Sequence, residues 1–253
     1  MRIGIRAATR ISRCALHLLW GLAIAAAALP CLSRTTRPFL VARWSRQLLE
    51  VLGIDLQTSG TPPTQGLLVA NHVSWVDIFA INASAATTFL AKDEVRDWPA
   101  IGWLAERVGT LFLERGSRSA AQRARQRLID ELRRGHRVGV FPEGATSFGE
   151  QVLPFHGALF QSAIDARTAV APAMLRYSEA DGRPTAAAAY VGDTSLWQCV
   201  RSIAAAHGLT VHVVFLPPID STGVDRRHLA HRSHQAISHA LARAVHPQPP
   251  GST

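Results

Sequence analysis

The order of apolar and polar residues along the chain predicts strands and helices in alternation. Runs of consecutive apolar residues bounded by turn residues indicate buried strands at 66–70, 109–113 and 137–141. Between the last two, a helix is expected from Ser119, with Ser119 and Gln122 as its cap, to the stop signal at Gly135. Such alternation predicts an α/β fold with a mostly parallel central sheet flanked by helices. Further strands are expected at 87–91, 168–175, 186–191 and 211–216, a loop at 58–64 and a last helix at 225–245.

The first part of the chain has a different pattern. Residues 14–32 carry no charge, and arginines lie on both sides of them, which fits both flanks being on the cytoplasmic side of a membrane. Residues 39–53 form an amphipathic pattern with a polar stripe from Arg43 to Glu50. A cleaved signal peptide, a single membrane span and a re-entrant or interfacial helix are all compatible with 14–32. We favour a membrane-dipping helical motif at 1–53, followed by an α/β domain at 54–253.

The charge balance adds an expectation about partners. The formal net charge is +9, and only Lys92 among the 27 basic residues is a lysine. This favours an anionic partner, such as anionic lipid or an acidic carrier protein. No zinc-finger spacing, RNP-like motif or continuous basic helix is present, so nucleic acid is not expected. The three cysteines are widely spaced and indicate neither a disulfide framework nor a metal site.

The segment from Asn71 to Asp77 contains the candidate chemistry. His72 and Asp77 would lie on opposite faces of a straight strand and about 140° apart on a straight helix. They can meet only if the chain turns between them. A strand ends at Ala70, and Ser74 with Asp77 resembles a capping box that opens a helix, so a turn is expected there. The spacing then suits a histidine base oriented by a carboxylate.

Two other loops are expected on the same edge of the sheet. Arg115 follows the strand at 109–113, and Glu143 and Gly144 follow the strand at 137–141. Ligands of open α/β sheets bind outside the carboxyl ends of strands. Each of these residues alone has an ordinary structural explanation, but their joint arrival at one edge predicts a site.

Four segments together resemble the lysophospholipid (glycerolipid) acyltransferase family, with bacterial 1-acyl-sn-glycerol-3-phosphate acyltransferases as its best-known members. They run, in the family's order, from about Leu67 to Pro218. The four are Asn71-His72-Val73-Ser74-Trp75-Val76-Asp77, Gly109-Thr110-Leu111-Phe112-Leu113-Glu114-Arg115, Phe141-Pro142-Glu143-Gly144-Ala145-Thr146-Ser147 and Val170-Ala171-Pro172-Ala173.

The resemblance implies an O-acyltransferase that needs no metal and no cofactor. A fatty acyl group would pass from an acyl-CoA or acyl-carrier-protein thioester to the free hydroxyl of a lysophospholipid. His72 would act as the general base and Asp77 would orient it. The implied acceptor-binding residues are Arg115, Glu143, Gly144, Thr146 and Ser147. The protein would work at the inner (cytoplasmic) membrane, with its catalytic domain facing the cytosol.

The third block departs from the family pattern. Where the family has Thr-Arg-Ser, this chain has Ala145-Thr146-Ser147, so an arginine expected near the acceptor is absent. The resemblance puts 1-acyl-sn-glycerol-3-phosphate first as acceptor, giving phosphatidate. The departure keeps lyso-ornithine lipid as an alternative, because its head group is an amino acid rather than a phosphate.

Two alternatives from other classes are a catalytically silent lipid-binding protein at the membrane surface and a secreted hydrolase. The histidine and two carboxylates count against the first, and no Gly-x-Ser-x-Gly nucleophile supports the second. Two further groups receive plain interpretations. His228, His231 and His234 are expected on a solvated helix face rather than at a metal. The arginines between 115 and 137 are expected on an exposed helix face, which would suit the docking of an acidic carrier protein or anionic lipid.

Overall fold

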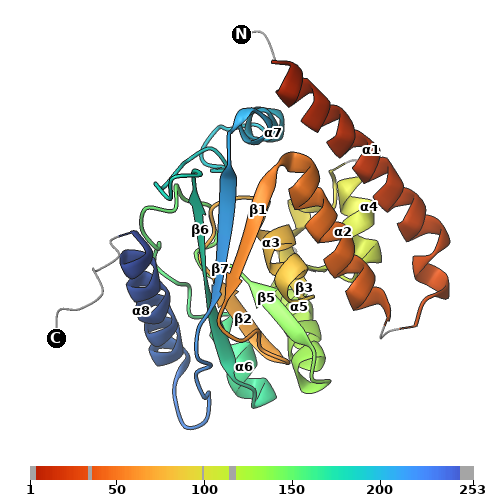
Figure 1. The fold of residues 1–253 in the computed structure, drawn as a ribbon. Helices are drawn as coiled ribbons and strands as arrows, with labels where there is room; N and C mark the ends of the chain where they lie inside the picture. Colours follow the sequence, from red (N-terminus) through yellow and green to blue (C-terminus); the bar gives the residue numbers. More distant parts are fainter. Residues whose placement is uncertain (1–3, 34–35, 99, 114–117, 246–253) are drawn as a thin grey trace.

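The protein folds around one twisted sheet (Figure 1). The computed structural model describes residues 4–33, 36–98, 100–113 and 118–245. Within these ranges the sheet has seven strands in the order β1-β7-β6-β2-β5-β3-β4. The strands are β1 (Ile54–Ser59), β2 (Gly66–Ala70), β3 (Thr88–Lys92), β4 (Leu111–Leu113), β5 (Arg137–Val140), β6 (Val170–Ser178) and β7 (Leu209–Phe215).

The strand directions make the sheet mostly parallel. Strands β6, β2, β5, β3 and β4 run in one direction, so their carboxyl ends share an edge. Strand β7 is antiparallel to β6, and β1 is parallel to β7, so these two run in the opposite direction. The predicted α/β fold with a mostly parallel sheet is therefore confirmed.

Helices cover both faces of the sheet, as consecutive side chains of β2 demonstrate. Leu68 packs into the core on the side of α2, α3 and α7, whereas Leu67 packs into the core beneath α5, α6 and α8. A strand buried on both faces has apolar residues at every position, which explains the unbroken apolar run at 66–70. The helices are α1 (Ile5–Ala27), α2 (Thr36–Leu52), α3 (Asp77–Ser84), α4 (Ile101–Arg107), α5 (Arg118–Arg133), α6 (Phe160–Ala166), α7 (Leu196–Ala205) and α8 (Arg226–Val245).

Helices α1 and α2 form a pair beside the sheet (Figure 1). Gly21 makes their close approach possible, because a Cβ there would lie 2.6 Å from the Trp44 indole nitrogen. His17 stacks on Trp44 with ring centroids 4.7 Å apart. Arg10 joins the pair to the rest of the fold by donating to the carbonyls of Ala204 and Ala206 at the end of α7, at 3.2 and 2.8 Å. Among the described residues, no helix has the length and apolar character needed to cross a membrane.

The structure corrects some expectations about individual elements. Residues 186–191 form no strand: the Tyr190 N–H donates to the Val73 carbonyl, in a loop that passes beside the β2–α3 connection. The expected loop at 58–64 begins two residues later, because Thr58 and Ser59 close strand β1. The patterning did not indicate β1, α4, α6 or α7. The other predicted strands are present, with ends shifted by as much as three residues.

Candidate active site

The connection between β2 and α3 brings His72 and Asp77 together. Strand β2 ends at Ala70 and helix α3 begins at Asp77, so the chain reverses between them as the spacing required. His72 Nδ1 lies 2.8 Å from Asp77 Oδ2. The predicted contact between these two residues is present.

Asp77 is completely buried, and four donors surround its carboxylate. Besides His72, its Oδ2 accepts from the backbone N–H groups of Val73 at 2.7 Å and Ser74 at 2.9 Å. Its Oδ1 accepts from the Tyr177 hydroxyl at 2.7 Å. Burial, together with the nearby Asp77 charge, raises the pKa of Tyr177 well above its usual value. A carboxylate with this many donors is held in one orientation and stays able to accept from the imidazole.

The start of α3 differs from the expected capping box. Val76 is the N-cap residue, and no side chain caps the helix. Only the reverse half of a capping box is formed, in which the Asp77 carboxylate accepts the Ser74 N–H. The interpretation of Ser74 as the cap is therefore wrong, because the turn is held by the aspartate that also contacts His72.

Asn71 fixes the start of this turn to the sheet. The last registered pair of β2 and β6 is Ala70 with Ala173. Beyond it, Asn71 Nδ2 donates to the Leu175 carbonyl at 2.9 Å, and Asn71 Oδ1 accepts the Leu175 N–H at 2.8 Å. The side-chain amide thus takes the place of a backbone amide. The main chain at His72 is free to leave the strand without losing the contact to β6.

The His72 ring lies on an aromatic surface. It stacks on Phe141 with centroids 3.9 Å apart and planes at 9°, and Phe141 stacks on Phe89. The His72 side chain is 19% exposed, whereas its partner is buried. Because the Asp77 carboxylate can only accept, the proton between them belongs to Nδ1, and in the neutral imidazole Nε2 is the acceptor. A ring held in this way can remove a proton from a bound hydroxyl.

Glu143 connects the third predicted block to the His72 loop. Its Oε1 accepts the His72 backbone N–H at 3.0 Å, and the residue is only 5% exposed. Burial raises the pKa of Glu143 to about 7, while the hydrogen bond from His72 acts in the opposite direction. The predicted convergence of these two loops is therefore present. The third loop of that prediction carries Arg115, which lies outside the described residues.

Thr146 and Ser147 use their polar groups within the protein. The Thr146 hydroxyl donates to the Tyr190 carbonyl. The Ser147 N–H donates to the His72 carbonyl at 2.8 Å, and its hydroxyl accepts from the Gly149 N–H at 3.2 Å. Gly144 is exposed and has a φ of 70°, a left-handed conformation that favours glycine. The observed contacts hold the loops together, and an acceptor-binding role for these residues stays a prediction.

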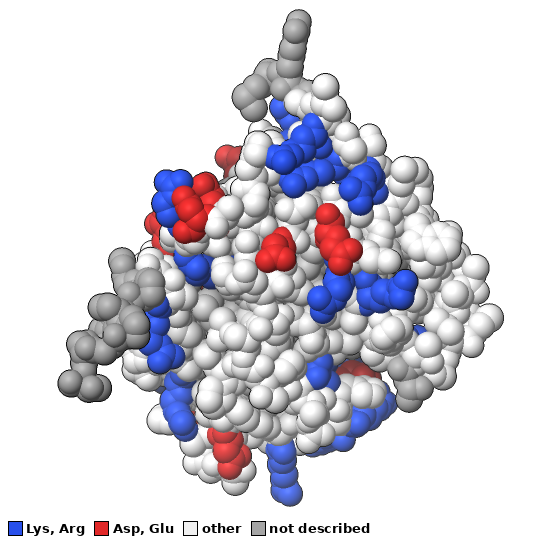
Figure 2. Space-filling view, viewed as in Figure 1, with Lys and Arg blue, Asp and Glu red and all other residues white. Residues whose placement is uncertain are grey.

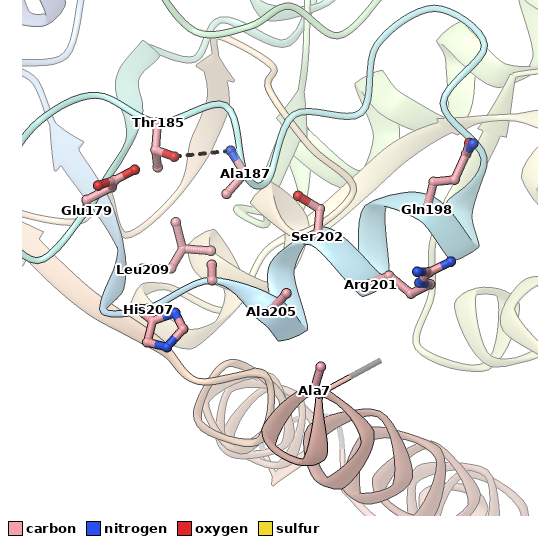
Figure 3. A pocket seen from close by; sticks show the side chains of 12 residues that line it. Ala7, Glu179, Thr185, Ala187, Gln198, Arg201, Ser202, Ala205, His207 and Leu209 are labelled. Atoms are coloured by element: carbon pink, nitrogen blue, oxygen red, sulfur yellow. Dashed lines mark hydrogen bonds between the residues drawn. The ribbon is translucent and has the colours of Figure 1, made fainter. Parts of the chain in front are cut away.

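A pocket lies elsewhere in the fold. A pocket of about 700 Å³ separates the start of α1 from α7, with Ala7 on one side and Arg201 and Ser202 on the other (Figure 3). None of its lining residues belongs to the predicted site. The imidazole and its carboxylate therefore lie apart from this pocket, at the shared carboxyl edge of β2, β5 and β6.

The histidines of α8 do not behave alike. Among the described residues, no group of three His, Cys, Asp or Glu side chains is placed to hold a metal ion. His228 and His231 are exposed as expected. His234 is partly buried: its Nε2 lies 3.2 Å from the Val152 carbonyl, and its ring packs edge-on against Phe155. The expectation that His234 is solvated is wrong.

Basic side chains form separate groups on the face shown in Figure 2, with acidic side chains between some of them. On α5, Arg125 pairs with Asp165, and Arg134 pairs with Glu131. These pairs neutralise part of the helix face where an acidic partner was considered. Docking of a carrier protein there stays a prediction.

Comparison with known proteins gives the relationships of the chain. A profile of the acyltransferase family matches residues 55–176. The chain is 43% identical to a lyso-ornithine lipid O-acyltransferase of Pseudomonas aeruginosa, over 81% of this chain and 79% of the relative. It is 39% identical to a 1-acyl-sn-glycerol-3-phosphate acyltransferase of Neisseria meningitidis, over 74% of each chain.

A solved structure agrees at the level of the fold. The crystal structure of the 1-acyl-sn-glycerophosphate acyltransferase PlsC from Thermotoga maritima superposes with a TM-score of 0.67. The superposition covers 95% of this chain and 99% of the Thermotoga chain, at 21% sequence identity. With its α/β fold and its two high-identity relatives, the chain belongs to the lysophospholipid acyltransferase family and is an acyltransferase.

Proposed function

We propose that this protein transfers a fatty acyl group from a thioester to the free hydroxyl of a lysolipid, with His72 as general base. The observation that carries the proposal is the 2.8 Å contact between His72 Nδ1 and a buried Asp77 whose carboxylate also accepts from three other donors. This contact fixes the tautomer in which Nε2 accepts a proton. The Phe141 ring beneath the imidazole keeps it in one plane.

The reaction follows from that tautomer. His72 Nε2 takes the proton of the acceptor hydroxyl as its oxygen attacks the thioester carbon. Asp77 stabilises the imidazolium that forms. The C–S bond then breaks, and the imidazolium returns the proton to the leaving thiolate. The oxygen is acylated, the thiol is released and the base is regenerated. No covalent acyl-enzyme, metal or cofactor takes part, and the acyl-CoA or acyl-carrier-protein donor is a co-substrate.

For the acceptor we place lyso-ornithine lipid first. Two observations support it: Ala145-Thr146-Ser147 lacks the arginine of the family's third block, and the Pseudomonas relative of that activity is 43% identical. A second candidate is 1-acyl-sn-glycerol-3-phosphate, which the sequence alone placed first. The Neisseria relative at 39% identity supports it. Either acceptor presents an anionic group, a carboxylate or a phosphate, beside its acyl chain.

The exposed side of α1 supports the proposal that the protein acts at a membrane surface. Leu16, Leu19 and Trp20 are 66%, 61% and 60% exposed, and they share one side of the helix. Arg6 and Arg13 lie on the same helix and are also exposed. An apolar strip with nearby arginines is typical of helices that lie in the interface of an anionic bilayer. We propose that the helix pair rests on the cytosolic side of the inner membrane.

The test is acyl transfer by the purified protein in mixed micelles. Labelled acyl-CoA and acyl-carrier protein are each offered with lyso-ornithine lipid and with 1-acyl-sn-glycerol-3-phosphate, and His72→Ala is the control. Ornithine lipid as the main product, absent with His72→Ala, supports the proposal. Phosphatidate as the main product keeps the reaction but replaces the acceptor. Tight binding of either acceptor without product from any pair identifies a silent lipid-binding protein and overturns the proposal.

A further inference from the structure

His156 lies next to the third block in space, although it lies outside that block in the sequence. Its backbone N–H donates to the Pro142 carbonyl at 2.8 Å. Its ring faces Gly144: the position that a Cβ on Gly144 would occupy is 3.3 Å from His156 Cδ2 and 3.4 Å from Nε2. The ring therefore lies directly beside the residue that follows Glu143, whose carboxyl group holds the His72 backbone.

The backbone before His156 is fixed on both sides. Phe155 packs against Phe160 of α6, with centroids 6.3 Å apart, and edge-on against His234 of α8, at 5.3 Å. His234 also contacts the Val152 carbonyl. Phe155 is thus partly buried between two helices, while the neighbouring His156 side chain is exposed. An exposed side chain on a fixed backbone is prepared for a ligand without a large loss of entropy.

Gly144 leaves the space in which the His156 ring lies. A side chain at 144 would press on the ring edge that carries Nε2. The positive φ of Gly144 would also strain any other residue. The His156 imidazole therefore lies beside the exposed Gly144, and the block itself contains no arginine.

We infer that His156 contacts the acceptor's head group, with its ring nitrogen bound to an anionic oxygen of the carboxylate or phosphate. The inference rests on the proposed function and goes further, because it names a specificity residue outside the family's four blocks. His156 supplies a ring N–H donor at the border of a block that lacks its usual arginine. Its single N–H donor can engage one anionic oxygen, whereas a guanidinium engages two oxygens of a carboxylate or phosphate and carries a permanent charge.

The first test separates binding from chemistry. The acceptor concentration is varied at a constant amount of detergent micelles. His156→Ala is then expected to raise the apparent KM for the preferred acceptor about tenfold, which corresponds to the free energy of one hydrogen bond to a charged group. The kcat is expected to stay within about twofold of the wild type, because His72 and Asp77 are intact. His228→Ala, which removes an exposed histidine from α8, is the matched control and should leave both constants unchanged.

A second variant tests for a change in acceptor preference, which a purely structural role of His156 would not produce. His156→Arg is expected to raise the ratio of kcat/KM for 1-acyl-sn-glycerol-3-phosphate to that for lyso-ornithine lipid by about tenfold, since the permanent guanidinium charge attracts the nearly doubly charged phosphate more strongly than a head group with one carboxylate and one ammonium group.

The outcomes are distinguishable from those for the proposed function. An active wild type with unchanged acceptor KM in His156→Ala and unchanged acceptor ratio in His156→Arg overturns the inference and leaves the proposed function standing. A lower melting temperature with lower kcat and constant KM also overturns it, because His156 would then only support the loop. A wild type without activity on either acceptor removes the proposed function, and the inference with it.

Discussion

The Tyr177 hydroxyl donates a hydrogen bond of 2.7 Å to Asp77 Oδ1, although the two residues are 100 positions apart in the sequence. Tyr177 belongs to β6, so the sheet itself holds the carboxylate that orients His72. The other oxygen of Asp77 is held by its own loop. The position of the proposed base thus depends on Tyr177, a residue of β6 that lies outside the four sequence blocks.

Tyr177→Phe is expected to lower kcat about tenfold and to leave the acceptor KM unchanged. The variant leaves Asp77 Oδ1 buried without its donor, which should also lower the free energy of unfolding by about 1.5–3 kcal/mol. Steady-state kinetics and urea unfolding measure the two effects. Tyr190→Phe is the control, because the contacts of Tyr190 to this loop use its backbone. An unchanged kcat in Tyr177→Phe would show that the loop alone orients Asp77.

Asp77→Asn should reduce turnover by about 10²- to 10⁴-fold, in the range of a lost general base. An amide cannot accept at both ends, so its NH₂ group must face either Tyr177 or the donors at Oδ2. The Nδ1–H tautomer of His72 is then no longer favoured. Nitrogen NMR of the His72 ring reports the tautomer directly, and a circular dichroism spectrum checks the fold. Wild-type turnover in this variant would exclude the pair as catalyst.

Asn71→Asp is expected to destabilise the protein by about 3–5 kcal/mol. One oxygen of the new carboxylate would keep the Leu175 N–H, but the other would face the Leu175 carbonyl, which now receives the Asn71 NH₂ group, so a buried negative charge would oppose an acceptor. Thermal unfolding measures the loss. Asn82→Asp is the comparison: Asn82 is also buried, but its oxygen accepts the Thr87 N–H, and a carboxylate retains that contact. Equal destabilisation of both variants would contradict the role assigned to Asn71.

Glu143 should make the stability depend on pH. Its pKa is about 7 in the folded protein, above the ordinary value of 4.5, so the folded state binds the proton more tightly than the unfolded state. This contribution is complete below about pH 4.5 and is lost as the pH rises through about 7. The loss amounts to about 3 kcal/mol. Urea unfolding from pH 4.5 to 8 should show a steeper decline in the wild type than in Glu143→Gln. Parallel curves would place the pKa of Glu143 in its ordinary range.

The exposed strip of α1 should control binding to vesicles. Leu16→Asp with Leu19→Asp is expected to weaken binding to anionic phospholipid vesicles by tenfold or more, because each leucine contributes about 1.5–3 kcal/mol when it enters an apolar phase. Activity on detergent-dispersed acceptor should persist, since both side chains are exposed on α1. Vesicle sedimentation measures the binding. Val108→Asp, at an exposed position after α4, is the control. Equal binding by the two proteins would refute the role of α1.

Local spacing was enough to predict the contact of His72 and Asp77, because a five-residue separation after a strand leaves few geometries. It could not indicate Tyr177 or Leu175, whose roles arise from the register of β6 beside β2. The expected strand at 186–191 failed for a related reason. Its run of alanines is apolar but has weak strand propensity, and its backbone groups bind Val73 and Thr146 instead of a neighbouring strand. Strand β1 was missed because its outer side chains are polar at a sheet edge.

His17 stacks on Trp44, Trp44 contacts Phe79 at a tilt with centroids 5.7 Å apart, and Phe79 contacts Trp75 edge-on at 5.8 Å. Trp75 lies in the same short loop as His72. Four rings therefore span from the outer helix to the turn that carries His72, and rigid rings in contact transmit position without compression. If α1 floats at the lipid interface as proposed, its depth also sets the height of the imidazole above the phosphate layer. The insertion depth of α1 would then place the His72 ring at the level of an acceptor hydroxyl that protrudes from the bilayer.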